Sequence, residues 1–471
     1  MVETMNYLND IVQTLSTFLW GNILIIPLIV LGIYFSFRSG FVQFTYFKEM
    51  IALLGDGIGK SVNKSGGISS FQAFCISTAS RVGTGNISGV AIAIVLGGPG
   101  AVFWMWLIAL LGAASSFVES TLAQIYKEKD EVGFRGGPAY YMEKGLGMRW
   151  LGIIFAGLIT ITFGLIFNAV QANTITAAFS NAFGMNKALL GIIISIVTAF
   201  IIFGGIERIA KASEVIVPIF ATLYILVALL VIILNIKEVP SVFSLIFQNA
   251  FGLREMGVGG IMGTIMHGVK RGLFSNEAGM GSAPNAAATA TVSHPVKQGL
   301  IQAFGVFVDT IIICTCTAFI ILLAGDYTNT NLTGIELTQA ALTSQFGNFG
   351  SYFVALCIVL FAFSSIIGNY YYGQSNIEFI KYNKTFMLIY RISVVAMVML
   401  GSLLKVSVVW DLADVFMGFM AIINLIAIAL LNREAIACLK DYKRQRKEGV
   451  KVPIFKASCI PSLKGKTSEW E

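Results

Sequence analysis

The sequence predicts an all-α polytopic membrane protein of about 11 transmembrane helices, built as a five-plus-five inverted repeat with two broken helices. The chain of 471 residues is 56% hydrophobic and only 12% charged, and its mean hydropathy is +0.79. This composition excludes an ordinary soluble domain. Long apolar runs recur along the chain, and two of them are interrupted at their centres by glycines and charged residues. These observations predict a bundle of spanning helices packed around the two interrupted ones.

Eleven apolar runs are long enough to cross a bilayer, which takes roughly 20 residues as a helix. We expect spans at 20–37, 71–97, 100–126, 150–182, 188–205, 213–235, 257–291, 299–324, 349–380, 385–403 and 412–431. Residues 1–70 hold a leading helix and a cytoplasmic loop. The next ten spans form a first repeat at 71–235 and a second at 236–432. Residues 433–471 are predicted to form a basic cytoplasmic tail.

The positions of lysine and arginine predict the orientation, because cytoplasmic connections are enriched in both. With the N-terminus outside, most of the 32 lysines and arginines fall in cytoplasmic connections. The outer connections hold only Lys187, Lys237, Arg254 and Lys405. The N-terminus is therefore predicted outside a cell membrane and the C-terminus in the cytoplasm. The net charge of +7 then reflects topology, so no nucleic-acid partner is expected. We interpret residues 440–471 as a solvated tail anchored on anionic lipid.

Two of the predicted spans are broken. The centre of span 71–97 carries Arg81, Gly83, Gly85, Asn86 and Gly89. The span 257–291 carries Lys270, Arg271, Asn276 and Glu277, with glycines at 272, 279 and 281 and a proline at 284. Glycine and proline interrupt helices, and freed backbone groups persist at membrane depth only where they are buried or line a wet cavity. The breaks run in opposite directions and each opens a set of five spans, which is typical of a secondary transporter with a midplane site. Helix amino ends there would bind a carboxylate, and unwound carbonyls would bind a cation.

Other classes of protein are disfavoured by what the spans lack. They carry no paired carboxylates, no His/Glu metal motif and no nucleophile–base pair, so we expect no enzyme. A channel would need a continuous polar pathway, whereas the polar residues cluster at the breaks. The six cysteines include no C-x-x-C pair, and we interpret them, like His267 and His294, as structural. Residues 1–19 lack the basic start of a cleaved signal peptide. No obligate protein partner is evident.

Two stretches carry a family resemblance. GGPGAVFWMWLIALLG at 97–112 and RGLFSNEAGMGSAPNAAATA at 271–290 resemble sequences of the sodium:alanine symporters, the alanine or glycine:cation symporter family. Supporting stretches lie at 133–147, 168–175 and 361–373. The resemblance covers essentially the whole membrane domain. It implies the fold of the amino acid–polyamine–organocation superfamily, with one extra leading helix, and import of a small neutral amino acid driven by sodium.

The resemblance also implies the substrate-binding residues. The wider superfamily has a Gly-x-Gly-Asn break in its first core helix, which corresponds here to residues 83–86. The expected substrate-binding residues are Thr84, Gly85, Asn86, Gln171, Gly272, Phe274, Ser275, Asn276, Gly279 and Asn369. Free N–H groups of both breaks would bind the carboxylate, and carbonyl and side-chain oxygens the ammonium. For Gln171 an interhelical amide hydrogen bond, contributing about 0.6 kcal/mol, is an equal alternative.

Paired hydroxyls on the eighth core helix hold sodium in related transporters, and Ser364 and Ser365 occupy that position here. Sodium, the expected coupling ion, takes five or six hard oxygen ligands. The carbonyls of Ala79, Val82 and Phe361 would complete this set. The alternative is that the two hydroxyls bond back to their own helix or allow close packing.

Five charged residues lie at membrane depth: Arg81, Lys270, Arg271, Glu277 and Asp309. Unpaired, each would cost at least about 2.5–3.5 kcal/mol, so pairing is expected. We expect the pairs to hold the broken helices in register and to act as gates. Glu277 and Asp309 are also the groups that would carry a proton in a proton-coupled amino-acid carrier, the nearest alternative to sodium symport.

Asn369 departs from the family pattern. Members associated with alanine and glycine often carry a large aromatic residue in a Gly-Trp-Tyr-Tyr-Tyr-like run, whereas this run is Gly368-Asn369-Tyr370-Tyr371-Tyr372. If this position walls the pocket, an amide leaves more room and adds hydrogen-bond donors and acceptors. The departure therefore favours a larger polar substrate such as glutamine.

Overall fold

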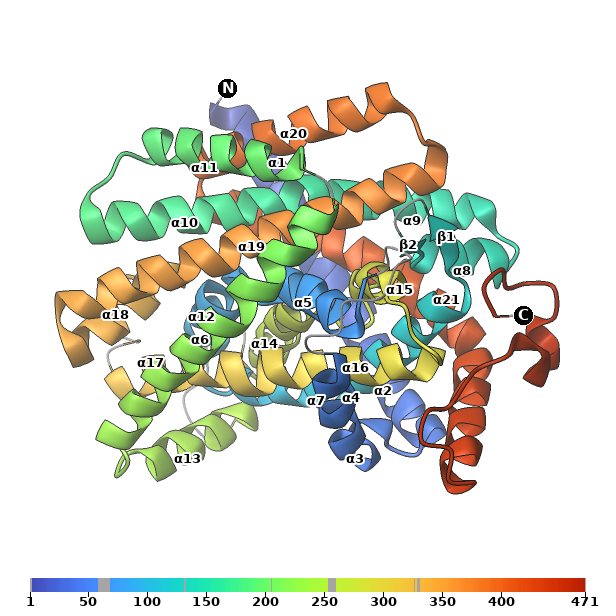
Figure 1. Cartoon of the computed structure of the whole chain (residues 1–471). Coiled ribbons are helices and arrows are strands. Elements are labelled where there is room, and N and C mark those ends of the chain that lie inside the picture. The colour runs from blue at the N-terminus through green and yellow to red at the C-terminus, as the bar shows by residue number, and fades with distance from the viewer. Residues whose placement is uncertain are drawn as a thin grey trace.

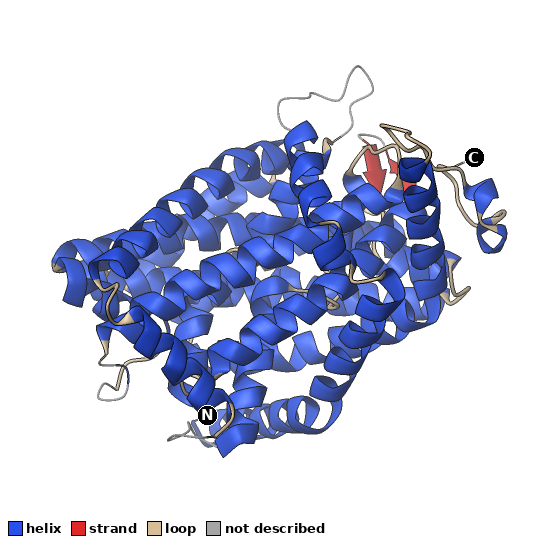
Figure 2. Cartoon of the chain, turned by 90° about the horizontal axis from the view of Figure 1, so that it is seen from below, coloured by secondary structure: helices blue, strands red, loops and turns tan. Residues whose placement is uncertain are grey.

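The computed structural model describes residues 2–57, 68–130, 133–204, 206–252, 260–325, 327 and 331–470. Helices dominate these ranges, and the sheet seen within them is one short hairpin (Figure 1, Figure 2). Arg254 of the predicted outer connections and Glu471 of the predicted tail lie outside the described residues.

The first half of the chain begins with a continuous leading helix. It consists of α1 (Val2–Phe18), the π-helix η1 (Leu19–Leu24) and α2 (Ile25–Ser39). The elements that follow are α3 (Val42–Thr45), α4 (Phe47–Gly57), α5 (Ser70–Arg81), the π-helix η2 (Gly85–Gly89), α6 (Val90–Gly97), α7 (Ala101–Ile125), β1 (Glu128–Asp130), β2 (Gly133–Arg135), α8 (Pro138–Lys144), α9 (Arg149–Ile161), the π-helix η3 (Thr162–Phe167), α10 (Asn168–Phe183), α11 (Lys187–Ile202) and α12 (Ile206–Leu234).

The second half repeats the pattern of a broken helix followed by long ones. Its elements are α13 (Val239–Ala250), α14 (Gly260–Asn276), α15 (Ala283–Thr289), α16 (Pro295–Val306), the π-helix η4 (Phe307–Cys314), α17 (Thr315–Ala324), α18 (Gly334–Phe346), α19 (Asn348–Lys381), α20 (Lys384–Leu403), α21 (Val406–Lys447) and the 3-10 turns η6 (Ala457–Cys459) and η7 (Pro461–Leu463). Across both halves, five helices that connect the spans were not predicted as elements: α3, α4, α8, α13 and α18.

Each predicted span corresponds to a helix or a pair of helices. Among the described residues, seven helical segments are long and apolar enough to cross a membrane. The span predicted at 71–97 is α5 and the η2–α6 segment, bent by 48° at the break. The span predicted at 257–291 is α14 and α15, separated by six residues. The predicted all-α, polytopic class is thus confirmed.

The two broken helices lie against each other in opposite directions. The half that comes first in the sequence of one broken helix meets the half that comes second in the other, because α6 packs on α14 while α5 packs on α15. Each is followed by a long helix, α7 or α16–η4–α17, and these two also pack together. This antiparallel pairing is the geometry that an inverted repeat produces.

The outer helices present apolar side chains away from the bundle. Phe200 and Ile196 on α11, Ile233 on α12 and Ile392 on α20 are exposed. Polar side chains show the reverse pattern, since Asn86, Ser275 and other polar groups of the central helices are fully buried. An apolar exterior around a polar centre fits a protein whose outer surface faces lipid.

The C-terminal region differs from the prediction. Residues 440–471 were expected to be solvated, but α21 continues to Lys447 and the chain then folds back on the bundle. Phe455, Leu463 and Trp470 are buried there. The prediction of a solvated tail was wrong because it weighed the basic residues and overlooked these apolar side chains, which bury favourably on folding.

Candidate substrate and sodium site

The first break exposes backbone carbonyls at the middle of the bundle. α5 ends at Arg81, and Val82 adopts an extended conformation (φ −76°, ψ 96°) before the helix resumes. A Cβ atom on Gly83 would collide with the Ser365 hydroxyl, so only glycine allows α19 to approach so closely. The carbonyls of Ala79 and Val82 consequently face α19.

The predicted sodium ligands lie together at this approach. The hydroxyl oxygen of Ser365 is 2.8 Å from Ala79 O, 3.0 Å from Phe361 O and 3.3 Å from Val82 O. Ser364 donates to Phe361 O at 2.8 Å. All five residues are fully buried. Neutral, hard oxygens gathered in this way fit the ligand preference of sodium. Ser364 and Ser365 also both bond to Phe361 O of their own helix, which was the alternative.

The predicted substrate residues of the first break bond to α10 and to the second broken helix. The amide N–H and the hydroxyl of Thr84 both donate to Gln171 Oε1, at 3.0 and 2.6 Å. Gln171 therefore forms an interhelical hydrogen bond, and that bond ends on the break itself. Gly85 faces Phe274 and Ser275, where a Cβ would lie 2.9 Å from the Phe274 ring.

Asn86, Ser275 and Asp309 form a second oxygen-rich cluster. Asn86 Nδ2 donates to Asp309 Oδ1 at 2.7 Å and to Ser275 Oγ at 3.0 Å. Ser275 and Thr310 donate to Asp309 Oδ2 at 2.7 and 2.8 Å. The cluster joins both broken helices to η4. It holds one carboxylate among hydroxyl and amide groups, which suits either a cation or a proton.

The second break is an unwound segment between α14 and α15. Asn276 ends α14, and its Oδ1 accepts the N–H of Ala278 at 3.0 Å. Glu277 has a left-handed backbone (φ 57°), which is uncommon for a residue with a side chain. Gly279 and Gly281 follow with φ values of 84° and 86°. Successive left-handed residues prevent a continuous helix and leave backbone groups in need of partners.

Two side chains that were not predicted satisfy this backbone. The carboxylate of Glu119 on α7 accepts the N–H groups of Gly279 and Gly281 at 3.0 and 3.1 Å. Asn424 on α21 donates to Glu119 Oε2 at 2.8 Å and to Gly279 O at 2.9 Å, and Tyr141 donates to Asn424. A lone carboxylate in the predicted span 100–126 was the signal that could have found Glu119.

Glu277 and Asn369 lie on either side of one hydroxyl. Ser80 Oγ is 2.9 Å from Glu277 Oε1 and 2.7 Å from Asn369 Oδ1. A hydroxyl carries one hydrogen, so it donates to only one of them at a time. Ser282 donates to the other Glu277 oxygen at 2.6 Å. Asn369 is fully buried, and its Nδ2 has no partner among the described residues.

An aromatic group closes one side of the predicted pocket. The Phe274 ring lies between those of Phe167 and Trp410, with centroids 4.6 Å from each. Gly272, one of the predicted substrate residues, lies instead against α7, where a Cβ would be 2.6 Å from Ile108 Cγ2. Gly272 therefore allows close helix packing, and its contact with substrate stays a prediction.

Two of the five predicted membrane charges share one carboxylate. Lys270 Nζ lies 3.1 Å from Asp414 Oδ2, and Arg271 pairs with the same oxygen. Lys270 also donates to Ser16 of the leading helix at 3.1 Å. The Arg271 guanidinium lies over the Trp410 ring at 4.6 Å, a cation–π contact. This pairing was expected; its acidic partner, Asp414, was not identified although it is an isolated acid in span 412–431.

The other three charges are held by neutral groups. Arg81 donates to Gln302 O at 3.2 Å and to Ser116 at 3.3 Å, and within the described ranges it has no ion pair. These two partners lie on α16 and α7. Glu277 and Asp309 likewise accept hydrogen bonds from hydroxyls and amides. A gating role for these residues stays a prediction.

A membrane bundle with two facing broken helices and a buried polar centre defines a secondary transporter. The chain belongs to the sodium:alanine symporter family, whose model matches residues 5–457. It is 57% identical to the probable sodium/glutamine symporter GlnT of Bacillus subtilis (strain 168), over 97% of this chain and 95% of that protein. It is also 57% identical to the amino-acid carrier protein AlsT of the same organism, over 99% and 98%.

A solved structure shows the same fold at low sequence identity. The manganese transporter of Eremococcus coleocola superposes with a TM-score of 0.55 at 13% identity, covering 86% of this chain and 91% of its own. At this identity the likeness concerns the fold alone. The family and its relatives are transporters, so the expectation that the chain is not an enzyme is confirmed.

Proposed function

We propose that this protein is a sodium-coupled symporter that imports a small neutral amino acid by alternating access. It lies in the cell membrane with the N-terminus outside, the C-terminus in the cytoplasm, and repeats at 71–235 and 236–432. The supporting observation is the approach of Ser365 to the carbonyls of Ala79 and Val82. A cation bound there would join α19 to the first broken helix, so ion binding would favour a particular arrangement of the repeats.

The amino acid would bind between the two breaks. Thr84, Gly85 and Asn86 on one side and Phe274, Ser275 and Asn276 on the other supply hydroxyl groups, side-chain amides and an apolar ring. Asn276 Nδ2 is fully buried without a partner among the described residues, so it is a free donor for a carboxylate. Coupling then requires only that ion and amino acid stabilise the same occluded arrangement.

Glutamine is the substrate that Asn369 favours over alanine. The unpartnered Asn369 Nδ2 is a buried donor, and leaving such a group unsatisfied costs about 1–3 kcal/mol. The carbonyl oxygen of a glutamine side chain would accept from it, and the amide of the same side chain would donate to Glu277. The 57% identity to GlnT agrees with this choice.

Proton coupling is the second candidate. Glu277 and Asp309 are fully buried, and within the described ranges neither forms an ion pair. A buried carboxylate without a cationic partner is the group that would take up a proton during transport. This candidate predicts amino-acid uptake that follows a proton gradient and ignores sodium.

The deciding experiment is uptake of labelled alanine and labelled glutamine by purified protein in liposomes at constant internal and external pH. An inward sodium gradient is compared with an equal potassium gradient, and protein-free liposomes give the background. Saturable uptake stimulated by sodium supports symport, and the faster amino acid identifies the substrate. Uptake that responds to an imposed proton gradient alone would move the coupling site from Ser365 to the carboxylates.

A further inference from the structure

One short connection ties the inner halves of both broken helices together. Gln124, at the end of α7, donates to Ala290 O at 3.0 Å, directly after α15. Lys127 Nζ donates to the same carbonyl at 3.1 Å. The N–H of Thr291 donates to Ile68 O at 3.0 Å, just before α5 begins. Either half-helix can therefore move away from α7 only if one of these bonds breaks.

The C-terminal strap, residues 453–470, lies across this connection at one end. The N–H of Phe455 donates to Ser293 O at 2.9 Å, and Ser293 Oγ donates to Pro453 O at 2.8 Å. The Phe455 ring packs edge-on against His294, with centroids 5.2 Å apart. The strap is thus bonded to the residues that directly follow the tie between the half-helices.

The other end of the strap is anchored by Trp470. Its buried indole donates from Nε1 to Gln124 O at 2.8 Å, and its ring lies 4.8 Å from Lys127 Nζ. Ser468 Oγ donates to Lys127 O at 3.2 Å. The peptide N–H of Ala457 donates to Trp470 O at 2.6 Å, so the strap closes on itself. Trp470 therefore contacts the two residues whose side chains hold Ala290.

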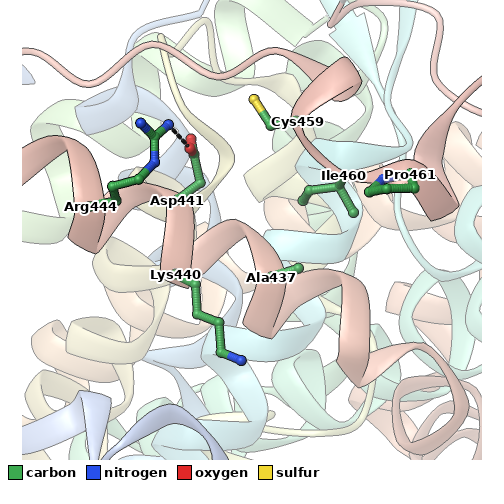
Figure 3. Close-up of a pocket in the computed structure, with 7 residues that line it drawn as sticks. All are labelled: Ala437, Lys440, Asp441, Arg444, Cys459, Ile460 and Pro461. Atoms are coloured by element: carbon green, nitrogen blue, oxygen red, sulfur yellow. Dashed lines mark hydrogen bonds and ion pairs between the residues drawn. The ribbon is translucent and has the colours of Figure 1, made fainter.

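The middle of the strap buries Leu463 but leaves a gap against α21. A cavity of about 330 Å³ remains between it and α21 (Figure 3). Its lining is Ala437, Lys440, Asp441, Arg444, Cys459, Ile460 and Pro461. Arg444 and Asp441 pair at 2.6 Å within α21, and Cys459 on the strap is exposed. A short segment without long helices of its own can detach without unfolding the helices beneath it.

We propose that the C-terminal strap is a latch that holds the inner halves of both broken helices closed, with Trp470 as its positioning residue. The proposal rests on the alternating-access function proposed above, because only a transporter needs to open this side. Trp470 touches no substrate residue; it acts by holding Gln124 and Lys127 in place on Ala290. Release of the strap precedes opening of the site to the cytoplasm.

Cys75 provides a natural reporter, because it is fully buried on α5, the inner half of the first broken helix. Inside-out membrane vesicles are treated with a membrane-impermeant maleimide, and mass spectrometry of peptides gives the labelling rate at Cys75. Trp470→Ala is expected to raise that labelling rate at least about fivefold, because the closed state loses the stabilisation from one hydrogen bond and one buried ring. Trp470→Phe keeps a ring but no donor and should give an intermediate rate. The matched control is Val452→Ala, an exposed residue next to the strap.

Equal Cys75 labelling in Trp470→Ala and Val452→Ala would overturn the latch. If Trp470→Ala does not insert into the membrane, Ser293→Ala is used instead, because it removes only the hydrogen bond to Pro453 O. Ser293→Ala should raise Cys75 labelling about twofold. No rise above the control would also overturn the proposal. Failure of the proposed function gives a different pattern, since uptake is then absent from every variant while the labelling rates still differ.

Discussion

The hydroxyl of Ser365 lies 2.8 Å from the carbonyl oxygen of Ala79, a residue 286 positions earlier in the chain. The contact joins a continuous helix of the second repeat to the end of a broken helix of the first. The contact exists because Gly83 has no side chain to block α19 and because α5 ends at Arg81. The proposed coupling of ion and substrate depends on this contact between the repeats.

Ser365→Ala should lower the apparent affinity for sodium by about 10- to 100-fold, because hydrogen bonds and contacts to a charged group contribute about 1.5–3 kcal/mol. Sodium titration of amino-acid uptake in liposomes measures this. Ser393→Ala, which removes an exposed hydroxyl bonded to Ile389 O on α20, is the control and should change nothing. An unchanged sodium dependence in Ser365→Ala would remove this residue from the ion site.

Asn369→Trp should reduce glutamine uptake at least about tenfold while alanine uptake is retained. The tryptophan ring fills the space for the glutamine side chain, and the substitution removes the free Nδ2 donor. A tenfold change corresponds to a loss of about 1.4 kcal/mol of differential binding free energy. Competition between the two labelled amino acids measures the shift. A glutamine rate that does not change, with the protein inserted at the normal level, counts against this pocket assignment.

Asp414→Asn should destabilise the protein by about 3–5 kcal/mol, because it leaves Lys270 and Arg271 buried without their shared carboxylate. Thermal unfolding in detergent measures the loss. Asp411→Asn, three residues earlier and only partly buried, should lower the unfolding temperature much less. Equal effects of the two substitutions would mean that the charge cluster adds little to stability.

Glu119→Gln should lower both uptake and stability. The two carboxylate oxygens of Glu119 accept hydrogen bonds from the N–H groups of Gly279 and Gly281 and from Asn424, whereas the amide of glutamine has only one acceptor oxygen. A loss of about 1–3 kcal/mol is expected for the unsatisfied group. Glu143→Gln, at the partly exposed C-terminal end of α8, is the control of equal chemistry. Wild-type uptake and unfolding temperature in Glu119→Gln would show that the unwound segment finds other partners.

Docking of the strap should weaken as the pH falls from about 6.5 toward 4. Burial lowers the pKa of His294 to about 4, although the hydrogen bond that His294 donates to Asp441 acts in the opposite direction. The groups that face His294 are Asp441 and Tyr442 of α21, Phe455 of the strap and Lys297 of α16. A lowered pKa means that docking favours neutral His294. Above the ordinary histidine pKa, His294 is neutral in both states and the docked strap is fully stable. As the pH falls below that value, His294 binds a proton in the undocked state first, so docking loses stability.

A nitroxide attached to Cys459, the exposed cysteine among the six, reports this docking through its mobility. Mobility should rise as the pH drops, whereas His294→Gln should show no such transition. A transition of the same size in the variant would assign the effect to another group.

The spans and the two breaks could be predicted because they depend on local composition. Apolar length decides what crosses a bilayer, and glycines or charges inside a span interrupt it wherever the helix packs. The family resemblance then pointed to Thr84, Asn86 and Ser275 beside the breaks, and their contact with substrate stays a prediction. The proposed sodium ligands on α19 came from family resemblance, since spacing alone did not distinguish ligands from packing hydroxyls.

The sequence by itself determined that the chain spans a membrane with two interrupted helices running in opposite directions. Only the tertiary structure decided which distant side chains complete them. Glu119, Asn424 and Asp414 satisfy groups more than 140 positions away, and Trp470 reaches back 346 positions to Gln124. Such partners are set by how helices pack and where unsatisfied backbone groups are left. Those quantities depend on the whole fold, whereas hydrophobic length and helix interruption depend on a few neighbouring residues.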